Sequence, residues 1–314
     1  MVSATGSILE MQVSDLDDRT RLRIERVLGR RVTAYRQVPT GYTPAGRWLV
    51  QLDDGSSAFA KQGQNLEHSE LATWLRTESR VYESLAGDFL PRRLAFDDDG
   101  DSCLLLLEDA SSWHWPPPWG AARVDAVLGM LGRLAAAPCP DWISPLEEFA
   151  DELGGWSRVA VDPEPFLGLE LVSRAWLDRH LQELLACERG VALSGDSIVH
   201  LDVRSDNLCL QGDRVLLVDW NWVRRGDARV DLAFWLPSLY AEGGPAPWEI
   251  LPRSGGLSAL LSGFFAARAG LPPLPQVPQL RPLQLTQLQA ALPWAARELG
   301  LDAPDGLGAR RSSP

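Results

Sequence analysis

Apolar and polar positions in the first third of the chain alternate between a helical period and short strand-like runs. Residues 14–30 open with Ser14 and, three positions later, Asp17, a start similar to a capping box, and then place apolar residues at near-helical spacing. A second helical pattern covers residues 69–85. Strand-like runs occupy residues 32–38, 48–52, 57–61 and 103–107. This part of the chain therefore predicts a small sheet accompanied by helices.

The rest of the chain has a mainly helical pattern that glycine and proline clusters interrupt. Helices are predicted over residues 121–137, 145–153, 166–187, 229–240, 257–269 and 282–299. One segment departs from this pattern, because the apolar residues 215–218 follow a turn at Gly212 and Asp213 and predict a hairpin. The Pro-rich segment 111–120, SSWHWPPPWG, marks the entry to this mainly helical part.

Length and charge limit the classes of protein to consider. The 314 residues suit two lobes, which we expect at residues 1–108 and 109–314. A net charge of -12 argues against nucleic acid or an anionic membrane as a partner, since both require a basic surface. The chain shows neither a signal-peptide pattern nor an apolar run near 18 residues, and its four cysteines are widely spaced. We expect a cytoplasmic protein with reduced thiols; its oligomeric state stays open.

The segment 199–220, VHLDVRSDNLCLQGDRVLLVDW, concentrates the residues that carry chemistry. His200, Asp202 and Asn207 fit the pattern H-x-D-x-x-x-x-N, and Asp219 follows the apolar run of the predicted hairpin. Phosphoryl transfer needs a carboxylate close to the acceptor hydroxyl and hard oxygen ligands for Mg²⁺. Asp202 has the position of the carboxylate close to the acceptor, while Asn207 and Asp219 qualify as metal ligands. The segment is therefore interpreted as a phosphoryl-transfer site.

A single lysine stands out among the basic residues. The chain has 30 Lys and Arg residues, of which only Lys61 is a lysine, at the end of a predicted strand. Lys and Arg meet phosphate oxygens differently, so this choice indicates a phosphate contact, although a solvated strand end remains an alternative. Glu78, on the predicted helix 69–85, is the favoured ion-pair partner, with Glu70 and Glu83 as rivals.

Together these residues resemble the protein-kinase-like superfamily, and the pair Asp219-Trp220 resembles its aminoglycoside phosphotransferase and choline kinase branch. Asp231 in GDARVDLAFWL matches the D-L-A segment of that branch. The resemblance implies an α+β, bilobal fold with a small N-lobe built on an antiparallel sheet and a larger, mainly helical C-lobe. It also implies ATP or GTP and Mg²⁺ as cofactors, and a Lys61–Glu78 pair directed at the α- and β-phosphates.

The resemblance extends to the expected nucleotide contacts in the first lobe. The loop containing Gly41, Tyr42 and Thr43 lies between two predicted strands, where its backbone N–H groups would cover the phosphates; a plain hairpin turn is the alternative. Glu108 and Asp109 follow the strand that resembles the hinge, whose backbone binds adenine in this superfamily. These two acidic residues also suit a simple strand end.

Three further residues receive roles from the resemblance. His200 is expected to hold the loop by hydrogen bonds to nearby backbone, and Asp231 to brace the same loop. Arg204 occupies the position from which a basic residue stabilises charge on the transferred group, and a solvent-facing arginine is the alternative.

The spacing of the acidic residues indicates the kind of acceptor. Only eleven residues separate Asp219 from Asp231, too few for the activation segment of protein kinases, so the acceptor should be a small molecule. Relatives phosphorylate aminoglycosides, macrolides, cyclic peptides, choline, homoserine or sugars, and the ending ARRSSP lacks the acidic residues that often bind aminoglycosides. Aromatic residues past Asp219 suit an apolar or sugar face, although core packing is the default: Trp220, Trp222, Phe234 and Trp235.

The favoured function is therefore an ATP- and Mg²⁺-dependent kinase that transfers a phosphoryl group to a hydroxyl of a small molecule, with Asp202 as the base. The acceptor would be an antibiotic, such as an aminoglycoside, or a metabolite. Two alternatives stay open: a catalytically silent nucleotide-binding scaffold and, less favoured because of the short acidic spacing, a protein kinase.

Overall fold

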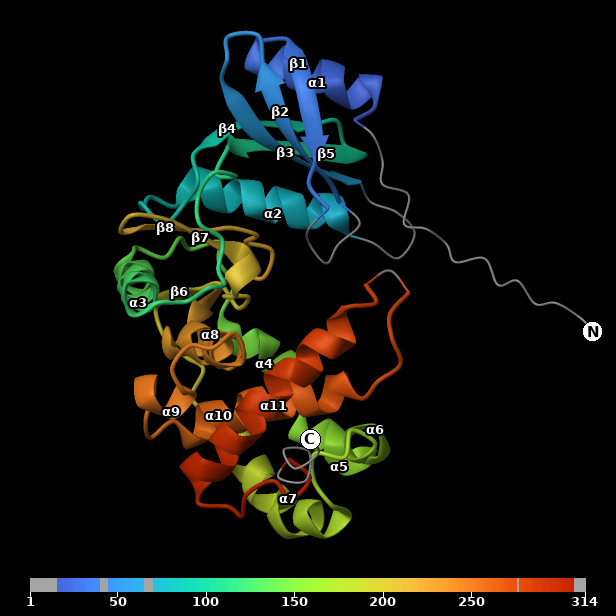
Figure 1. The fold of residues 1–314 in the computed structure, drawn as a ribbon, viewed down its shortest axis with the longest axis vertical. Helices are drawn as coiled ribbons and strands as arrows, with labels where there is room; N and C mark the ends of the chain where they lie inside the picture. Colours follow the sequence, from blue (N-terminus) through green and yellow to red (C-terminus); the bar gives the residue numbers. More distant parts are fainter. Residues whose placement is uncertain (1–15, 40–44, 65–69, 276, 308–314) are drawn as a thin grey trace, which may run out of the picture. The chain divides into compact units, whose positions relative to one another are not determined.

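The computed structural model describes residues 16–39, 45–64, 70–275 and 277–307. The chain forms two compact units. Unit 1 comprises residues 1–79 and 92–110, and unit 2 comprises residues 80–91 and 111–314. Figure 1 shows the antiparallel strands of unit 1 and the mainly helical unit 2. The predicted α+β fold, with an N-terminal antiparallel sheet and a helical C-terminal part, is confirmed.

Unit 1 is built on a five-stranded antiparallel sheet with the order β1-β2-β3-β5-β4. Its strands are β1 (Val32–Gln37), β2 (Gly46–Leu52), β3 (Ser57–Gln64), β4 (Arg93–Asp98) and β5 (Ser102–Glu108). The sequence pattern identified four of them and missed β4, whose sequence RLAFDD lies at the edge of the sheet. An edge strand whose residues are only partly buried lacks the clean apolar alternation that reveals a strand.

The alternation of side chains along β3 separates the two faces of this sheet. Ala58 and Ala60 belong to the core under α1 (Asp18–Leu28). The same core contains Leu16, Ile24, Trp48, Val50, Leu52, Leu104 and Leu106. Lys61 and Gly63 lie on the opposite face, where α2 (Leu71–Ser84) begins. A Cβ atom on Gly63 would lie 2.7 Å from the carbonyl oxygen of Leu71, so this close approach requires glycine.

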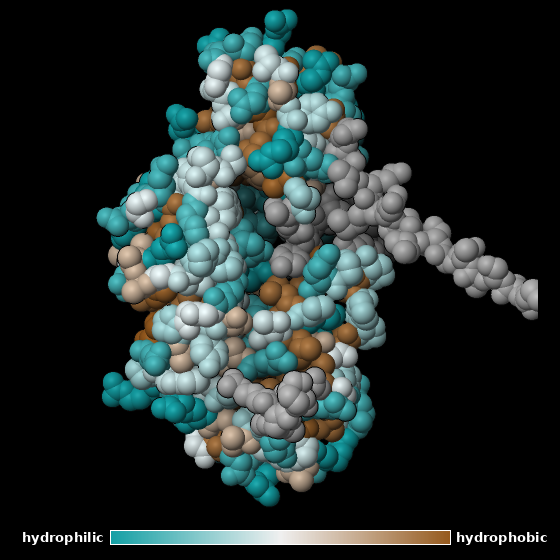
Figure 2. Space-filling view, in the orientation of Figure 1, coloured by the Kyte–Doolittle hydropathy of each residue, from teal (hydrophilic) through white to brown (hydrophobic). Residues whose placement is uncertain are grey.

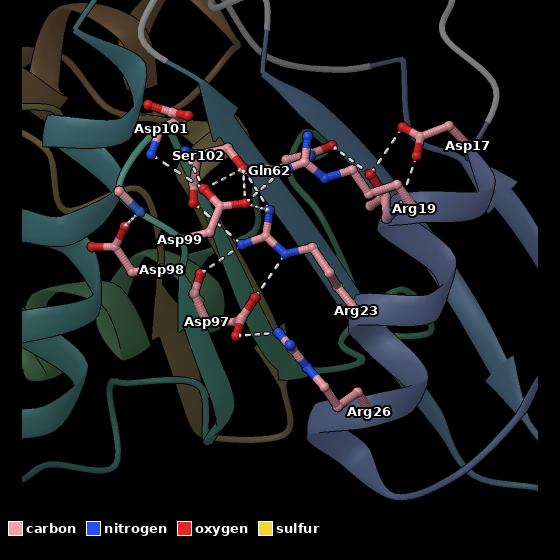
Figure 3. Close-up of polar contacts among 12 residues, drawn as sticks. Asp17, Arg19, Arg23, Arg26, Gln62, Asp97, Asp98, Asp99, Asp101 and Ser102 are labelled. Carbon is pink, nitrogen blue, oxygen red and sulfur yellow. Dashed lines mark hydrogen bonds and ion pairs between the residues drawn. The ribbon is translucent and has the colours of Figure 1, made fainter.

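Ion pairs fasten α1 to the end of strand β4 (Figure 3). Arg23 Nε donates to Asp97 Oδ2 at 2.7 Å, and Arg26 donates to the other oxygen of the same carboxylate at 2.7 Å. The N-cap of α1 is Asp17, which accepts from the Thr20 N–H at 2.7 Å. Ser14, the predicted start of the capping box, lies outside the described residues.

Unit 2 is mainly helical, as predicted. Its helices are α3 (Ala121–Ala136), η1 (Leu146–Phe149), α4 (Ala150–Leu153), α5 (Trp156–Val161), α6 (Glu164–Leu167), α7 (Arg174–Arg189), η2 (Ser205–Asn207), α8 (Arg229–Ala241), α9 (Pro247–Ile250), α10 (Gly255–Ala269) and α11 (Leu280–Leu299). The continuous helix predicted over residues 166–187 is wrong. Helix α6 ends at its C-cap, Gly168, and the next helix, α7, begins after its N-cap, Ser173. The Ser173 hydroxyl accepts a hydrogen bond from the Trp176 N–H at 3.1 Å.

Two small antiparallel ladders carry the segment with the H-x-D-x-x-x-x-N pattern. Strand β6 (Ser197–Val199) pairs with β9 (Arg224–Gly226), and β7 (Leu208–Gln211) pairs with β8 (Arg214–Leu217). The second ladder is the predicted hairpin. Because β6 leads into His200 and β8 leads into Asp219, the two ladders determine where the acidic loop residues lie.

The surface of the protein is largely polar on the face shown in Figure 2, with smaller hydrophobic areas between the hydrophilic residues. Among the described ranges, none of the helices combines the length and apolar character that crossing a membrane requires.

Candidate active site

The candidate residues of unit 1 include a buried ion pair. Lys61 Nζ lies 2.7 Å from Glu78 Oε2, and the two side chains are only 9% and 2% exposed. The rival carboxylates, Glu70 and Glu83, both belong to exposed residues. The structure therefore selects Glu78 as the acidic partner of the single lysine, with β3 and α2 holding one member each.

For the other residues predicted to contact the nucleotide, the structure gives either no description or contacts within unit 1 only. Gly41, Tyr42 and Thr43 lie outside the described residues. Glu108 Oε1 accepts from the Arg92 N–H at 3.1 Å, and Asp109 Oδ2 accepts from the Ser57 hydroxyl at 2.7 Å. Both carboxylates thus fasten strand ends within unit 1, and a role of the backbone here in adenine binding stays a prediction.

His200 ties the loop of residues 200–207, which we call the acidic loop, to the end of β8. Its side chain is fully buried, its Nδ1 accepts from the Asp202 N–H at 3.2 Å, and its Nε2–H donates to the Val218 carbonyl at 3.0 Å. The ring also contacts Trp220 edge-on, with centroids 4.6 Å apart. Burial lowers the pKa of His200 to about 4, so the imidazole is neutral near pH 7. These contacts give it a structural position within the loop.

Asp231, in the first turn of α8, accepts hydrogen bonds from two consecutive backbone amides. Its carboxylate oxygens lie 2.7 Å from the N–H groups of His200 and Leu201. Leu201 has a φ of 67°, a left-handed conformation that a branched side chain rarely adopts. Burial raises the pKa of Asp231 to about 7, against the opposing effect of the two amide donors. The carboxylate thus holds a strained turn directly before Asp202.

The carboxylate of Asp202 is fixed by two neighbours on the same loop. Asn207 Nδ2 donates to Asp202 Oδ2 at 2.9 Å and to the Asp202 carbonyl at 2.8 Å. Arg204 Nε lies 2.7 Å from Asp202 Oδ1, and the guanidinium also reaches Asp206 Oδ2 at 3.2 Å. With 12% of its side chain exposed, Arg204 lies between two carboxylates rather than in solvent.

Asp219 follows β8 in a left-handed conformation, with a φ of 69°. Its Oδ1 accepts a hydrogen bond from Asn221 Nδ2. The carboxylates of Asp202 and Asp219 both act electrostatically on Asp206 and on His200, which places them in one neighbourhood.

The donor set near Asp219 fits Mg²⁺. Because Asp202 accepts from Asn207 Nδ2, the Asn207 atom left to contact a cation is the hard oxygen Oδ1. Within the described ranges, no three His, Cys, Asp or Glu residues form a metal-binding group. Mg²⁺ is commonly held by one or two protein ligands together with phosphate oxygens and water, so the kind of oxygen ligand that Asn207 and Asp219 offer fits this ion.

The aromatic residues beyond Asp219 divide into buried and exposed. Trp220 and Trp235 are fully buried, and Phe234 is nearly so, which gives these three a packing role. Trp222 differs from them, because 38% of its surface is exposed.

Comparison with known proteins places the chain in a family. The model of the phosphotransferase enzyme family matches residues 24–269, well over half of the chain. The chain belongs to this family. The branch predicted from the sequence is therefore confirmed, and the protein is a phosphotransferase.

Two solved structures share the fold of this phosphotransferase. One, from Thermobifida fusca YX-ER1 and provisionally described as a fructosamine-3-kinase, is 17% identical, with a TM-score of 0.53 over 87% of this chain and 98% of the other. A choline/ethanolamine kinase family protein from Mesorhizobium loti is 12% identical, with a TM-score of 0.53 over 85% of this chain and 91% of the other. The search of curated protein sequences returns no significant match.

Sequence reasoning missed three residues of the phosphotransferase that contact the site. Asp206 binds Arg204, and Asn221 binds Asp219; both lie within the acidic segment, where their spacing was a usable signal. Glu242, at the end of α8, accepts from the Ser205 hydroxyl at 2.6 Å and from Trp119 Nε1 at 2.7 Å. Nothing in the sequence links Glu242 to the loop, because tertiary folding alone brings residues so far apart together.

Proposed function

We propose that this phosphotransferase moves the γ-phosphoryl group of ATP, or of GTP, to a hydroxyl group of a small molecule. The acceptor oxygen attacks the γ-phosphorus, the bond from that phosphorus to the β–γ bridging oxygen breaks, and ADP leaves. The hydroxyl proton passes to a carboxylate oxygen of Asp202. The observation that carries this proposal is the anchoring of the Asp202 carboxylate by Asn207 and Arg204.

The proposed roles divide between the two parts of the chain. Residues 1–108 form the nucleotide-binding lobe, in which Glu78 orients Lys61 toward the α- and β-phosphates. Further nucleotide contacts come from the loop residues Gly41, Tyr42 and Thr43 and from the backbone at Glu108 and Asp109. Residues 109–314 form the catalytic and acceptor-binding lobe. The buried Lys61–Glu78 pair supports this division, because a carboxylate at 2.7 Å fixes the ammonium in one position.

Asn207 and Asp219 are the proposed holders of Mg²⁺. The bound metal supplies positive charge to the phosphate oxygens. Arg204 adds charge next to Asp202, and we assign it to the stabilisation of charge on the transferred group. His200 and Asp231 keep the loop in place and touch neither substrate. The roles of His200 and Asp231 rest on their hydrogen bonds to backbone groups of the loop. Those of Asn207 and Arg204 rest on the Asn207–Asp202 hydrogen bond and the Arg204–Asp202 ion pair.

A small acceptor fits the short connection between Asp219 and Asp231. The eleven intervening residues form the β9 ladder and the start of α8, which leaves no segment for positioning a polypeptide. Two proteins of the same fold carry names that refer to fructosamine and to choline or ethanolamine, which are small compounds. The acceptor of this chain is an antibiotic or a metabolite of comparable size, and the four widely spaced cysteines favour a cytoplasmic location.

The test is acceptor-dependent release of ADP from ATP and Mg²⁺ across a panel of antibiotics, sugars and amino alcohols. With the acceptor found, Asp202→Ala should lower kcat by roughly 10²- to 10⁴-fold while leaving ATP affinity unchanged. Asp213→Ala, in the exposed hairpin turn, is the matched control and should keep full activity.

Three results would contradict the proposal. Full turnover by Asp202→Ala would remove its proposed base. ATP left unconsumed with every acceptor would favour the silent scaffold, and phosphorylated side chains on generic protein substrates would favour a protein kinase.

A further inference from the structure

One aromatic residue of the catalytic segment reaches the surface. Within residues 199–231, all of which are described, Trp222 is the exposed large hydrophobic residue. It comes three positions after Asp219, one of the proposed metal ligands. Burying the exposed part of this indole under a ligand would remove apolar surface from water, and the position is adjacent in sequence to the proposed chemistry.

The β6–β9 ladder brings the segments of Trp222 and of the proposed base, Asp202, to the same end of one pair of strands. Val199 pairs with Arg224 at the end of this ladder. From that pair the chain runs forward through His200 to Asp202, and on the other strand it runs back to Trp222. Both segments therefore leave the same end of one two-stranded ladder within unit 2.

A second segment, the one that leads into η1, packs against the indole of Trp222 through Phe149. The Arg225 N–H donates to the Ser144 carbonyl at 2.9 Å, which fastens the chain leading into η1 against β9. At the end of η1, Phe149 contacts Trp222 with ring centroids 6.0 Å apart and an angle of 32° between the rings. We call Trp222, Phe149 and Arg224 the aromatic platform.

Arg224 determines which charge this aromatic platform accepts. Its guanidinium carbon lies 4.9 Å from the centre of the Phe149 ring, and its Nη1 donates to the Val223 carbonyl at 2.8 Å. A cation already occupies the attractive position over the Phe149 ring of this platform. A second cation, such as the ammonium group of an amino alcohol or of an aminoglycoside, would meet a like charge there.

We propose that the aromatic platform binds the acceptor, and that the acceptor is an uncharged hydroxylated ring of the sugar or cyclitol class. The C–H face of such a ring packs against the indole of Trp222, and its hydroxyls extend from the edge of the ring toward Asp202. Glu148, an exposed residue whose charge acts on Arg224, offers a carboxylate that accepts hydrogen bonds from ring hydroxyls. This assignment of the acceptor rests on the proposed function.

Binding is measured separately from turnover, by saturation-transfer NMR of the full chain with Mg²⁺ and a non-hydrolysable ATP analogue. The neutral probes are methyl glucopyranoside, methyl ribofuranoside and myo-inositol, and the cationic probes are choline and streptomycin. We expect a neutral ring to bind wild type, Trp222→Ala to weaken this binding about tenfold, and Trp222→Phe to weaken it less than about threefold. Trp115→Ala is the control, since Trp115 is also 38% exposed and lies outside the aromatic platform.

A second variant tests the charge argument. Arg224→Gln removes the cation from the Phe149 ring and should improve choline binding relative to the neutral probes by about threefold or more. Unchanged discrimination in this variant, with wild-type melting behaviour, would count against the assigned ring chemistry.

The outcomes separate this inference from the proposed function. If wild type binds none of the neutral rings, or if Trp222→Ala binds them as tightly as Trp115→Ala does, the aromatic platform is overturned. If binding depends on Trp222 but no phosphoryl group is transferred, the platform stands and the proposed function fails. If turnover occurs with KM unaffected by Trp222→Ala, the proposed function stands and the platform fails.

Discussion

The candidate functional residues of unit 1 and those of unit 2 are held in different ways. In unit 1, an ion pair between β3 and α2 fixes the Lys61 ammonium. In unit 2, the carboxylate of Asp202 belongs to a network in which a helix, a loop and the end of a hairpin each contribute a side chain or a backbone group. The first arrangement joins two regular elements directly, whereas the second distributes the task over irregular backbone.

This difference reflects what each part has to hold. A lysine at the end of a regular strand already has its backbone fixed by the ladder, so a carboxylate on the neighbouring helix can orient its side chain. The acidic loop has no ladder, and both Leu201 and Asp219 adopt left-handed conformations. Such backbone costs about 1 to 3 kcal/mol at each residue and persists only where several contacts enforce it.

Breaking the unit 2 network should have the largest effect on stability. Asp231→Ala leaves the buried amides of His200 and Leu201 without an acceptor, and each such loss costs about 1 to 3 kcal/mol. We expect the free energy of unfolding of unit 2, measured in urea, to fall by about 4 kcal/mol and the two amides to exchange hydrogen faster. Asp178→Ala, at an exposed position on α7, is the control. An equal effect in both variants would show that the loop needs no brace.

Breaking the unit 1 pair should have the next largest effect. Glu78→Gln removes the carboxylate from a buried ammonium, which costs about 3 kcal/mol because the remaining charge is left in a poorly solvated position. ATP affinity should fall as Lys61 loses its orientation, while the hydrogen exchange of the amides at residues 200 and 201 stays unchanged. Isothermal titration with ATP gives the affinity. Glu83→Gln, an exposed carboxylate on the same helix, should match wild type; a similar loss there would undermine the role given to Glu78 in unit 1.

Acid should weaken the unit 2 network through His200. Its pKa is lowered by burial to about 4, whereas an unfolded histidine titrates near 6.5, so its contribution to stability is lost as the pH falls from about 6.5 to 4. Asp231 acts in the opposite sense, since its pKa is raised to about 7 and its contribution is lost as the pH rises from about 3.8 to 7.

The contribution of His200 is isolated by comparison with His200→Gln, which cannot titrate but keeps Asp231. The stability advantage of wild type over this variant, from urea unfolding, should shrink by up to about 1.4 kcal/mol per pH unit below pH 6.5. An advantage that stays constant from pH 7 to pH 4.5 would show that His200 is not a buried neutral member of the network.

Several features of the site were predictable because local spacing determines them. The pattern of His200, Asp202 and Asn207, with an apolar strand ending at Asp219, is enough to place these residues on one loop and hairpin. The single lysine identified Lys61. The choice of Glu78 over Glu70 and Glu83 was less certain, because helical spacing alone does not tell which side of α2 faces the sheet.

Other features depend on contacts between distant segments. The edge strand β4 and the break between α6 and α7 were missed, because neither leaves a clear periodic pattern. The aromatic residues after Asp219 differ in their exposure to solvent, and only the fold shows that Trp222 is partly exposed while Trp220 is buried.

The sequence by itself determined the family, the α+β class and the residues of the acidic loop, since these follow from short-range patterns of charge and hydrophobicity. Only the tertiary structure decided that Glu78 pairs with Lys61, that Glu242 contacts the loop and that Phe149 supports Trp222. The physical reason is that burial and hydrogen bonding between segments far apart in the chain depend on how elements pack, which no local period encodes.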